Sequence, residues 1–180
     1  MYFMLSAAPL FLVFLMQLCT RLRSAGANAA NWSNLVLGAG VVSTALFAVT
    51  ALSRGVVAQS IRFADAPIPG PDTLRYADAF GFAAFGLGAI PFAAIAVAAA
   101  SGIIVRTGVF GRWLGWLGVV VAVGSLVAVG FRVGALASPL IILWVVAASF
   151  VIWRTRNAAT AYPAAAGHGG MPAVSPSASR

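Results

Sequence analysis

Uncharged stretches long enough to cross a membrane alternate along the chain with short segments that carry arginine or aspartate. Because a helix needs about 20 apolar residues to cross the hydrocarbon core of a bilayer, each stretch predicts one membrane span. The pattern predicts spans at residues 1–20, 35–53, 79–105, 113–131 and 135–153. We therefore expect residues 1–156 to form one transmembrane domain, an all-α integral membrane helical bundle of about five transmembrane helices.

Two polar segments predict the connections between the first three spans. Residues 24–34 are rich in Asn and Ala, and residues 54–78 contain all three acidic residues of the protein. The proline-rich stretch 66–71 excludes a continuous helix within the second segment. Pro71 followed by Asp72 then favours the start of a new helix, since proline suits the first turn and aspartate its positive dipole end.

The boundary between the last two spans is predicted from the length of the apolar region and not from charged residues. Residues 113–153 contain Arg132 as their single charge. One helix of that length would measure about 60 Å, which is twice the thickness of the hydrocarbon core. We therefore expect a hairpin that folds near residues 130–139, where Gly134 and Pro139 interrupt the helical pattern.

The third predicted span contains a proline near its middle. Pro91 removes one backbone hydrogen bond, so we expect a helix kink there. Helices broken at the midplane of the membrane also build binding sites in transporters, because they free backbone groups. A packing role and a role in a substrate site are therefore both open for Pro91.

Composition agrees with a chain that lies in lipid. The 180 residues are 62% hydrophobic and 8% charged, whereas soluble domains are about 45–50% apolar and roughly 25% charged. The net charge of +8 raises the question of nucleic acid. The basic residues, all arginine, flank the spans in ones and twos instead of forming a patch with base-stacking groups. We therefore expect anionic lipid headgroups as partners and no nucleic acid.

The distribution of arginine also predicts the orientation. Segments on the side of the C-terminus contain no acidic residue and carry Arg21, Arg23, Arg106, Arg112, Arg154 and Arg156; the opposite side carries Arg54, Arg62, Arg75, Arg132 and every aspartate. Because cytoplasmic segments carry the excess of basic residues, we predict the N-terminus outside and the C-terminus in the cytoplasm. Tryptophans, which are enriched at membrane interfaces, fall at the predicted cytoplasmic side: Trp32, Trp113, Trp116 and Trp153.

Residue types that carry catalysis or bind metals are scarce. A metal site needs a cluster of His, Cys, Asp or Glu, but Cys19 stands alone in the first span. His168 lies in residues 157–180, an Ala, Pro, Gly and Ser segment that predicts a disordered cytoplasmic tail. The centres of the spans have no ionisable residue, which argues against an ion or proton path; their polar residues are Ser43, Thr44, Ser125 and Ser149. We expect no enzyme and no cofactor.

Two features are open to a structural role between helices. Asp78 and Arg132 lie at the predicted outer ends of neighbouring spans and form a candidate interhelical ion pair, although both also suit a hydrated helix end and Arg75 offers Asp78 a nearer partner. Glycines four residues apart, as in Gly111 and Gly115 or in Gly130 and Gly134, fit close approach of helices. They leave a homo-oligomer or another membrane protein open as a partner.

The turn that joins the third and fourth spans is similar in sequence to a turn of other membrane proteins. Residues 106–118, Arg-Thr-Gly-Val-Phe-Gly-Arg-Trp-Leu-Gly-Trp-Leu-Gly, resemble an R-T-G-x-x-P-R-W-L-G-W-L-G turn of small uncharacterised multi-pass membrane proteins of actinobacteria. The segment from Leu143 to Arg154 is similar to a later part of the same pattern, while Gly111 departs from it by replacing proline. The resemblance implies an integral membrane domain of unknown function in the bacterial plasma membrane and assigns no catalytic residue. These proteins typically have six spans, so we expect either that a first span precedes Met1 or that the first helix has been lost.

Two functions from different classes fit these observations. The first is a non-enzymatic accessory or partner-binding membrane module, which predicts a close-packed interior and exposed faces of small residues. The alternative is a small transporter or exporter of a neutral or lipophilic solute, which predicts a continuous polar or hydrated cavity around Pro91, Ser43 and Thr44. The packing between the helices distinguishes the two.

Overall fold

The structure, a computed structural model, describes residues 2–24, 27–64 and 67–166. The described part of the chain contains helices and no strand, so the prediction of an all-α helical bundle is confirmed. Its elements are α1 (Tyr2–Arg23), α2 (Ala27–Ala64), α3 (Pro71–Ala83), the π-helix η1 (Ala84–Ala89), α4 (Ile90–Thr107), α5 (Arg112–Gly130), the 3-10 helix η2 (Gly134–Ala137) and α6 (Ser138–Ala166).

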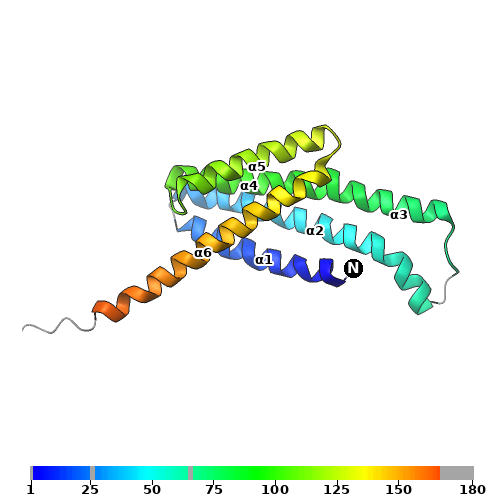
Figure 1. Ribbon diagram of the computed structural model, residues 1–180, viewed down its shortest axis with the longest axis horizontal. Helices are drawn as coiled ribbons and strands as arrows, with labels where there is room; N and C mark the ends of the chain where they lie inside the picture. The colour runs from blue at the N-terminus through cyan, green and yellow to red at the C-terminus, as the bar shows by residue number, and fades with distance from the viewer. Residues whose placement is uncertain (1, 25–26, 65–66, 167–180) are drawn as a thin grey trace, which may run out of the picture.

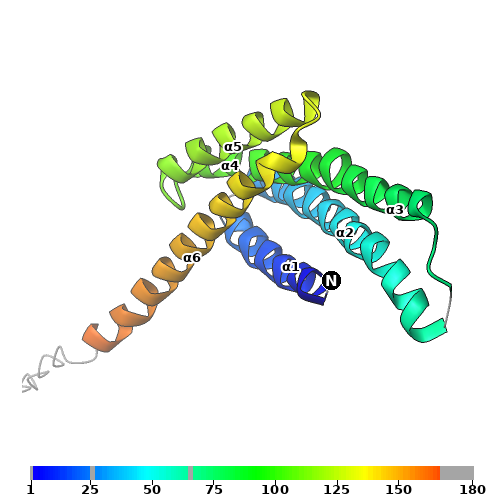
Figure 2. The same ribbon diagram turned by 45° about the vertical axis from the view of Figure 1, so that its right-hand side comes forward.

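Successive helices run up and down in the bundle (Figure 1). The continuous segment α3–η1–α4 lies antiparallel to α2, while α1 packs on α2 and α5 packs on α4. The last helix, α6, crosses this group obliquely, and its C-terminal half leaves the bundle in both views (Figure 2). The ends of α1, α4 and α6 therefore lie on the same side as the starts of α2 and α5.

Among the described residues, four helical segments are long and apolar enough to cross a membrane, which identifies the chain as a membrane protein. They are Ala29–Ser53, Pro71–Thr107, Arg112–Gly130 and Gly134–Arg154. These segments contain or overlap the second to fifth spans predicted from the sequence. A fifth span formed by α1, over the predicted residues 1–20, stays a prediction.

Helices in this protein continue well past the charges that end the apolar stretches. The prediction that residues 24–34 and 54–78 are connections is wrong for most of their length, because α2 starts at Ala27 and ends at Ala64. A charge is costly in lipid, but arginine, glutamine and alanine are all good helix formers, so α2 continues as it leaves the apolar stretch. The predicted helix start at Pro71 is confirmed.

The last helix is also longer than predicted. The prediction of a disordered tail from residue 157 onward is wrong for residues 157–166, which extend α6 to Ala166. Alanine is the strongest helix former, and extending an existing helix avoids the cost of nucleation. Residues 167–180, with His168, lie outside the described part.

The predicted turns in the second half of the chain are confirmed. The basic turn uses Gly108 with φ 70° as the C-cap of α4 and Gly111 with φ 85° before α5. Such positive φ values favour glycine, and the proline found at the second position in the resembling pattern is restricted to φ near −65°. The hairpin between α5 and α6 folds through η2, as Gly134 and Pro139 predicted.

The most extensive packing between two helices joins α4 and α5. A Cβ atom placed on Gly115 would lie 3.0 Å from the backbone nitrogen of Val105 and 3.2 Å from the carbonyl oxygen of Ser101. Gly118 faces the Ser101 side chain and the indole of Trp144, which is 2% exposed. Gly115 therefore serves packing within the chain, where the sequence left open a contact with a partner.

Trp144 fastens α6 to this contact. Its indole Nε1–H donates a hydrogen bond to the carbonyl oxygen of Leu114 on α5 at 3.3 Å. The ring covers Gly118, where a Cβ atom would lie 2.5 Å from the indole nitrogen. The absence of a side chain at Gly118 thus allows three helices to meet at one level of the bundle.

Replacing Gly118 by valine is expected to weaken the bundle by roughly 1–3 kcal/mol, because overpacking forces neighbouring side chains or backbone to shift. The matched control is Gly124→Val on the same helix, where an added Cβ atom would meet no neighbouring helix within 4 Å. The free energy of unfolding of both variants in mixed micelles checks the expectation. Equal stability of the two variants would contradict it.

Candidate ligand cavity

A cavity of about 680 Å³ lies between α1, α2, the η1–α4 junction and α6. It includes Ser43 and Thr44 and lies beside Pro91, the region in which the transporter hypothesis predicted a continuous polar or hydrated cavity. The location agrees, but the expected polar character of the cavity is wrong, because most lining side chains are apolar. Its lining consists of Ala7, Ala8, Leu10, Phe11, Phe14, Ser43, Thr44, Phe47, Phe85, Ala89, Ile90, Ala93, Ser138, Ile141, Ile142, Val145 and Ser149. None of these side chains is ionisable.

The walls of the cavity are mostly hydrocarbon and aromatic. Phe11 and Phe14 on α1 lie with their ring centroids 6.1 Å apart. Across the cavity, Phe47 on α2 and Phe85 on η1 form a second pair at 6.0 Å. Aromatic pairs have preferred ring geometries and contribute energy beyond the area that they bury. The two pairs therefore hold the aromatic rings of the cavity walls in fixed positions.

Three of the four hydroxyl groups in the lining donate to backbone carbonyls. Ser43 donates to the carbonyl oxygen of Ala89 at 2.8 Å, which joins α2 to the end of η1. Thr44 donates to Gly40 within its own helix, and Ser138 donates to Ala135. These three hydroxyl groups therefore have no hydrogen left to donate to a ligand. The cavity thus provides few hydrogen bonds for a polar or charged ligand.

The helix beside the cavity changes type immediately before Pro91. Residues Ala84–Ala89 form a π-helix, and the backbone N–H of Ile90 donates to the carbonyl of Phe85, five residues earlier. A proline lacks the N–H of the regular helix and clashes with the carbonyl four residues before it. The wider turn accommodates both effects, so the interruption predicted at Pro91 takes the form of a π-helical segment, a feature often found at functional sites.

The π-helix also brings η1 against the hairpin between α5 and α6. A Cβ atom on Gly134 would lie 2.7 Å from the carbonyl oxygen of Gly86. Gly134 is therefore required for close approach of backbone to backbone. This contact holds the start of α6 next to η1 and fixes that end of the cavity.

The cavity is closed at its inner end by the core of the bundle. Leu18, Val36 and Trp144 pack beneath it, and all three are at most 2% exposed. A residual void of about 10 Å³ remains between these residues and the cavity floor formed by Phe14 and Ala93. The cavity is thus a dead-ended site and not a continuous path through the bundle.

The mouth of the cavity lies between α1 and α6. The two helices diverge in Figure 2, and residues of both line the opening. Leu10 on α1 is 72% exposed and Ile142 on α6 is 61% exposed, although both belong to the lining. An opening between two apolar helices faces the lipid and not the aqueous phase.

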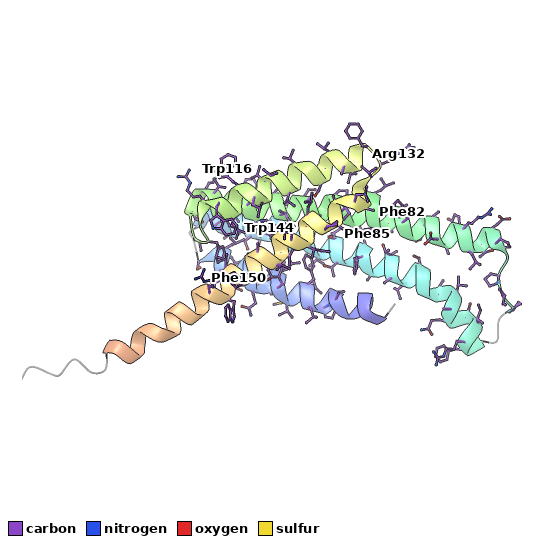
Figure 3. All side chains as sticks on the ribbon, in the orientation of Figure 1. Phe82, Phe85, Trp116, Arg132, Trp144 and Phe150 are labelled. Atoms are coloured by element: carbon purple, nitrogen blue, oxygen red, sulfur yellow. The ribbon has the colours of Figure 1, made fainter. Side chains whose placement is uncertain are left out.

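Asp78 and Arg132 lie outside this cavity. Arg132 lies at the turn after α5 (Figure 3). It is exposed and has a φ of 61°. Asp78 on α3 is exposed too and lines a smaller pocket with Ser53 and Leu74. In the same helix Arg75 and Asp72 form an exposed ion pair at 3.8 Å, and the pair of Asp78 with Arg132 stays a prediction.

The opposite end of the bundle is held by polar contacts that the sequence did not reveal. Cys19 and Ser33, both buried, form a reciprocal pair in which each side chain donates to the carbonyl of the other, at 3.5 and 3.3 Å. Arg23 donates to the Asn34 side chain at 2.8 Å. These contacts join α1 to the start of α2, which the sequence had placed in a loop.

Tryptophan and arginine surround the same end. The side chains predicted at one interface are about half exposed in the structure: Trp32, Trp113, Trp116 and Trp153. Trp116 points away from the bundle in Figure 3, and Arg106 lies over the Trp32 ring at 5.9 Å. Exposed tryptophan beside arginine is typical of a membrane–water interface.

Comparisons with models of protein families, with curated proteins and with solved structures gave no match for this chain. Among the described residues, no group of three His, Cys, Asp or Glu side chains is placed to hold a metal ion. The candidate site is therefore defined by the shape and lining of the cavity alone.

Removing the Ser43 hydroxyl is expected to lower the free energy of unfolding by about 0.6 kcal/mol, the average for hydrogen bonds between membrane helices, and by no more than about 1.7 kcal/mol. Ser43→Ala deletes the bond that joins α2 to η1. Thr44→Val is the matched control, because that hydroxyl bonds within its own helix and also lines the cavity. A larger loss for Thr44→Val in a denaturant titration in micelles would contradict the role of Ser43.

Proposed function

We propose that the protein is a non-enzymatic integral membrane protein that binds a neutral, lipophilic solute in the cavity between α1 and α6, as a small transporter or exporter does. The observation that carries the proposal is the 680 Å³ cavity itself. Pockets for small molecules have volumes of about 300–1,000 Å³ and a mostly apolar lining. The cavity fits both properties and includes Ser43 and Thr44, but it is apolar and dead-ended where the transporter hypothesis predicted a continuous polar or hydrated cavity.

The chemistry of the lining supports a neutral solute. A charge moved into an apolar site without a partner is strongly unfavourable, and the described lining residues include no ionisable side chain to act as that partner. The three hydroxyl groups that donate to carbonyls further reduce the hydrogen bonds on offer. Binding must therefore depend on contacts with hydrocarbon and aromatic groups.

An accessory or partner-binding module is the second candidate function. The observation that favours it is the C-terminal half of α6, which leaves the other helices (Figure 1). Phe150 and Trp153, near the middle of α6 where it leaves the bundle, are both more than half exposed. Another membrane protein or a second copy of the chain would find an accessible apolar helix there.

We further propose that the protein is multi-pass in the bacterial plasma membrane, with the N-terminus outside and the C-terminus in the cytoplasm. The arginine-rich end of the bundle, which contains the Trp32–Arg106 contact, supports this orientation. In this orientation Arg21, Arg23 and Arg154 face anionic headgroups of the inner leaflet. The cavity then lies toward the outer leaflet.

The orientation predicts which engineered thiols react in intact cells. In a Cys19→Ser background, Ile68→Cys, at a position that is 81% exposed between α2 and α3, is expected to react with a membrane-impermeant maleimide. Ser177→Cys in the tail is expected to react only after permeabilisation. Labelling of Ser177→Cys in intact cells would contradict the orientation.

Filling the cavity is expected to abolish binding of a small apolar solute. Ala93→Phe places an aromatic ring in the cavity, since Ala93 lines both the cavity and the void below it. The readout is photolabelling by a small neutral diazirine in nanodiscs, mapped by mass spectrometry and competed with unlabelled solute. We expect competable labelling of peptides 7–14 and 138–149 to fall about tenfold or more, which corresponds to at least about 1.4 kcal/mol of binding free energy.

Ala98→Phe is the matched control, because Ala98 lies on the same helix with its side chain exposed. This variant is expected to label like the unmodified protein. Labelling that is equal in Ala93→Phe and Ala98→Phe, or that excess solute does not reduce, would contradict the proposed function.

A further inference from the structure

The cavity is elongated along the helices that form it. On α6 its lining extends from Ser138 to Ser149, a distance of about 16 Å at 1.5 Å per residue. On α1 it extends from Ala7 to Phe14, or about 10 Å. The longer distance is about half of the roughly 30 Å hydrocarbon core, which is the depth occupied by the acyl chains of one leaflet.

From this shape we infer that the cavity holds one acyl chain of a membrane lipid, drawn from the leaflet at the side of the α6 start, with the headgroup left outside the bundle. The inference rests on the proposed binding of a lipophilic solute and names the chemical class of that solute. A compact solute would occupy part of the cavity, whereas an extended chain follows its full length.

The chemistry of the lining favours the acyl chain of a lipid inside the cavity and excludes its headgroup. Lipid headgroups carry phosphate or other strongly polar groups, and burying such groups without hydrogen bonds is unfavourable. Ser43, Thr44 and Ser138 have already given their hydrogens to backbone carbonyls, so the interior provides no donor from these residues. A hydrocarbon chain needs none, and it gains contacts with Phe11, Phe14 and the other apolar walls.

The mouth provides lateral access for such a chain. It opens between α1 and α6, whose lining residues Leu10 and Ile142 are largely exposed. Ala7 and Ala8 at the same level of α1 carry only methyl groups, which keeps the opening wide. A lipid in the surrounding bilayer can therefore insert one chain sideways while its headgroup stays at the membrane surface.

The inner end of the cavity sets where the chain stops. Trp144 is 2% exposed, so lipid around the bundle does not contact it. The indole nevertheless lines the small void directly below the cavity floor, together with Phe14 and Ala93. A chain that reaches the floor formed by Phe14 and Ala93 comes close to this ring, and Trp144 is therefore a built-in reporter of occupancy.

The test uses bromine atoms near the end of the acyl chain, which quench tryptophan fluorescence on close contact. In the full-length protein the four exposed tryptophans are replaced: Trp32→Phe, Trp113→Phe, Trp116→Phe and Trp153→Phe. Trp144 is then the remaining fluorophore of this type. In bilayers of a phosphatidylglycerol with brominated chain ends, we expect Trp144 to lose most of its emission relative to the unbrominated lipid.

Two cavity-filling variants and one control complete the experiment. Ala93→Phe and Ala8→Phe fill the cavity from opposite walls, and either is expected to restore most of the Trp144 emission, whereas Ala98→Phe on the exposed face of α4 is not. Thermal unfolding of each variant identifies the ones that fold, and two independent filling variants keep the test decisive if one does not. Quenching that is equal in all variants, or absent in the parent, overturns the inference.

A second arm separates this inference from the proposed function. A small brominated aromatic solute is added to bilayers of unbrominated lipid. If this solute quenches Trp144 in the parent and not in the filled variants, while brominated lipid has no such effect, the acyl-chain inference is wrong and binding of a lipophilic solute stands. If neither quenches Trp144 in a manner that depends on Ala93, both are wrong.

Discussion

The contact on which the bundle depends is the close approach of α4 and α5 at two glycines. Gly115 and Gly118 let the backbone of α5 reach the Ser101 level of α4, and only a residue without a side chain allows this distance. The gap above Gly118 receives the indole of Trp144, which bonds back to Leu114. In lipid, apolar surface gives no net drive for helices to associate, so close packing and hydrogen bonds of this kind must hold them together.

This arrangement explains why a cavity forms beside a well-packed core. Trp144 fixes α6 to α5 at one level, and the Gly86–Gly134 approach fixes the start of the same helix to η1. Neither contact draws α6 toward α1, which is held instead against α2 by the Cys19–Ser33 pair at the other end. The two helices consequently diverge, and in a bilayer the opening between them is filled by lipid at no cost in exposed apolar area.

The sequence predicted the helical bundle and the turns at Gly108 and Gly134, because each depends on local composition. Its transporter alternative expected a continuous polar or hydrated cavity around Ser43 and Thr44, whereas the cavity present there is apolar and dead-ended. The sequence misplaced the ends of α2, since arginine marks where lipid becomes unfavourable and not where a helix stops. It could not predict the π-helix before Pro91: a proline signals an interruption, but the form of that interruption depends on Ser43 and Gly134, which approach from other helices. The size of the cavity was equally hidden, because it follows from the angle between α1 and α6 and from no residue pattern.

The same scarcity of charge that argues against ion coupling favours a hydrocarbon ligand. A site for an ion or a polar solute in lipid needs groups whose hydrogen bonds are free when the ligand is absent, and such groups are themselves unfavourable there. Ser43, Thr44 and Ser138 avoid that penalty by donating to carbonyls, one of them the Ala89 carbonyl at the end of the π-helix. The cavity walls are thus stable for the same reason that they select apolar occupants: the hydrogen bonds that a polar ligand would need are already made within the bundle.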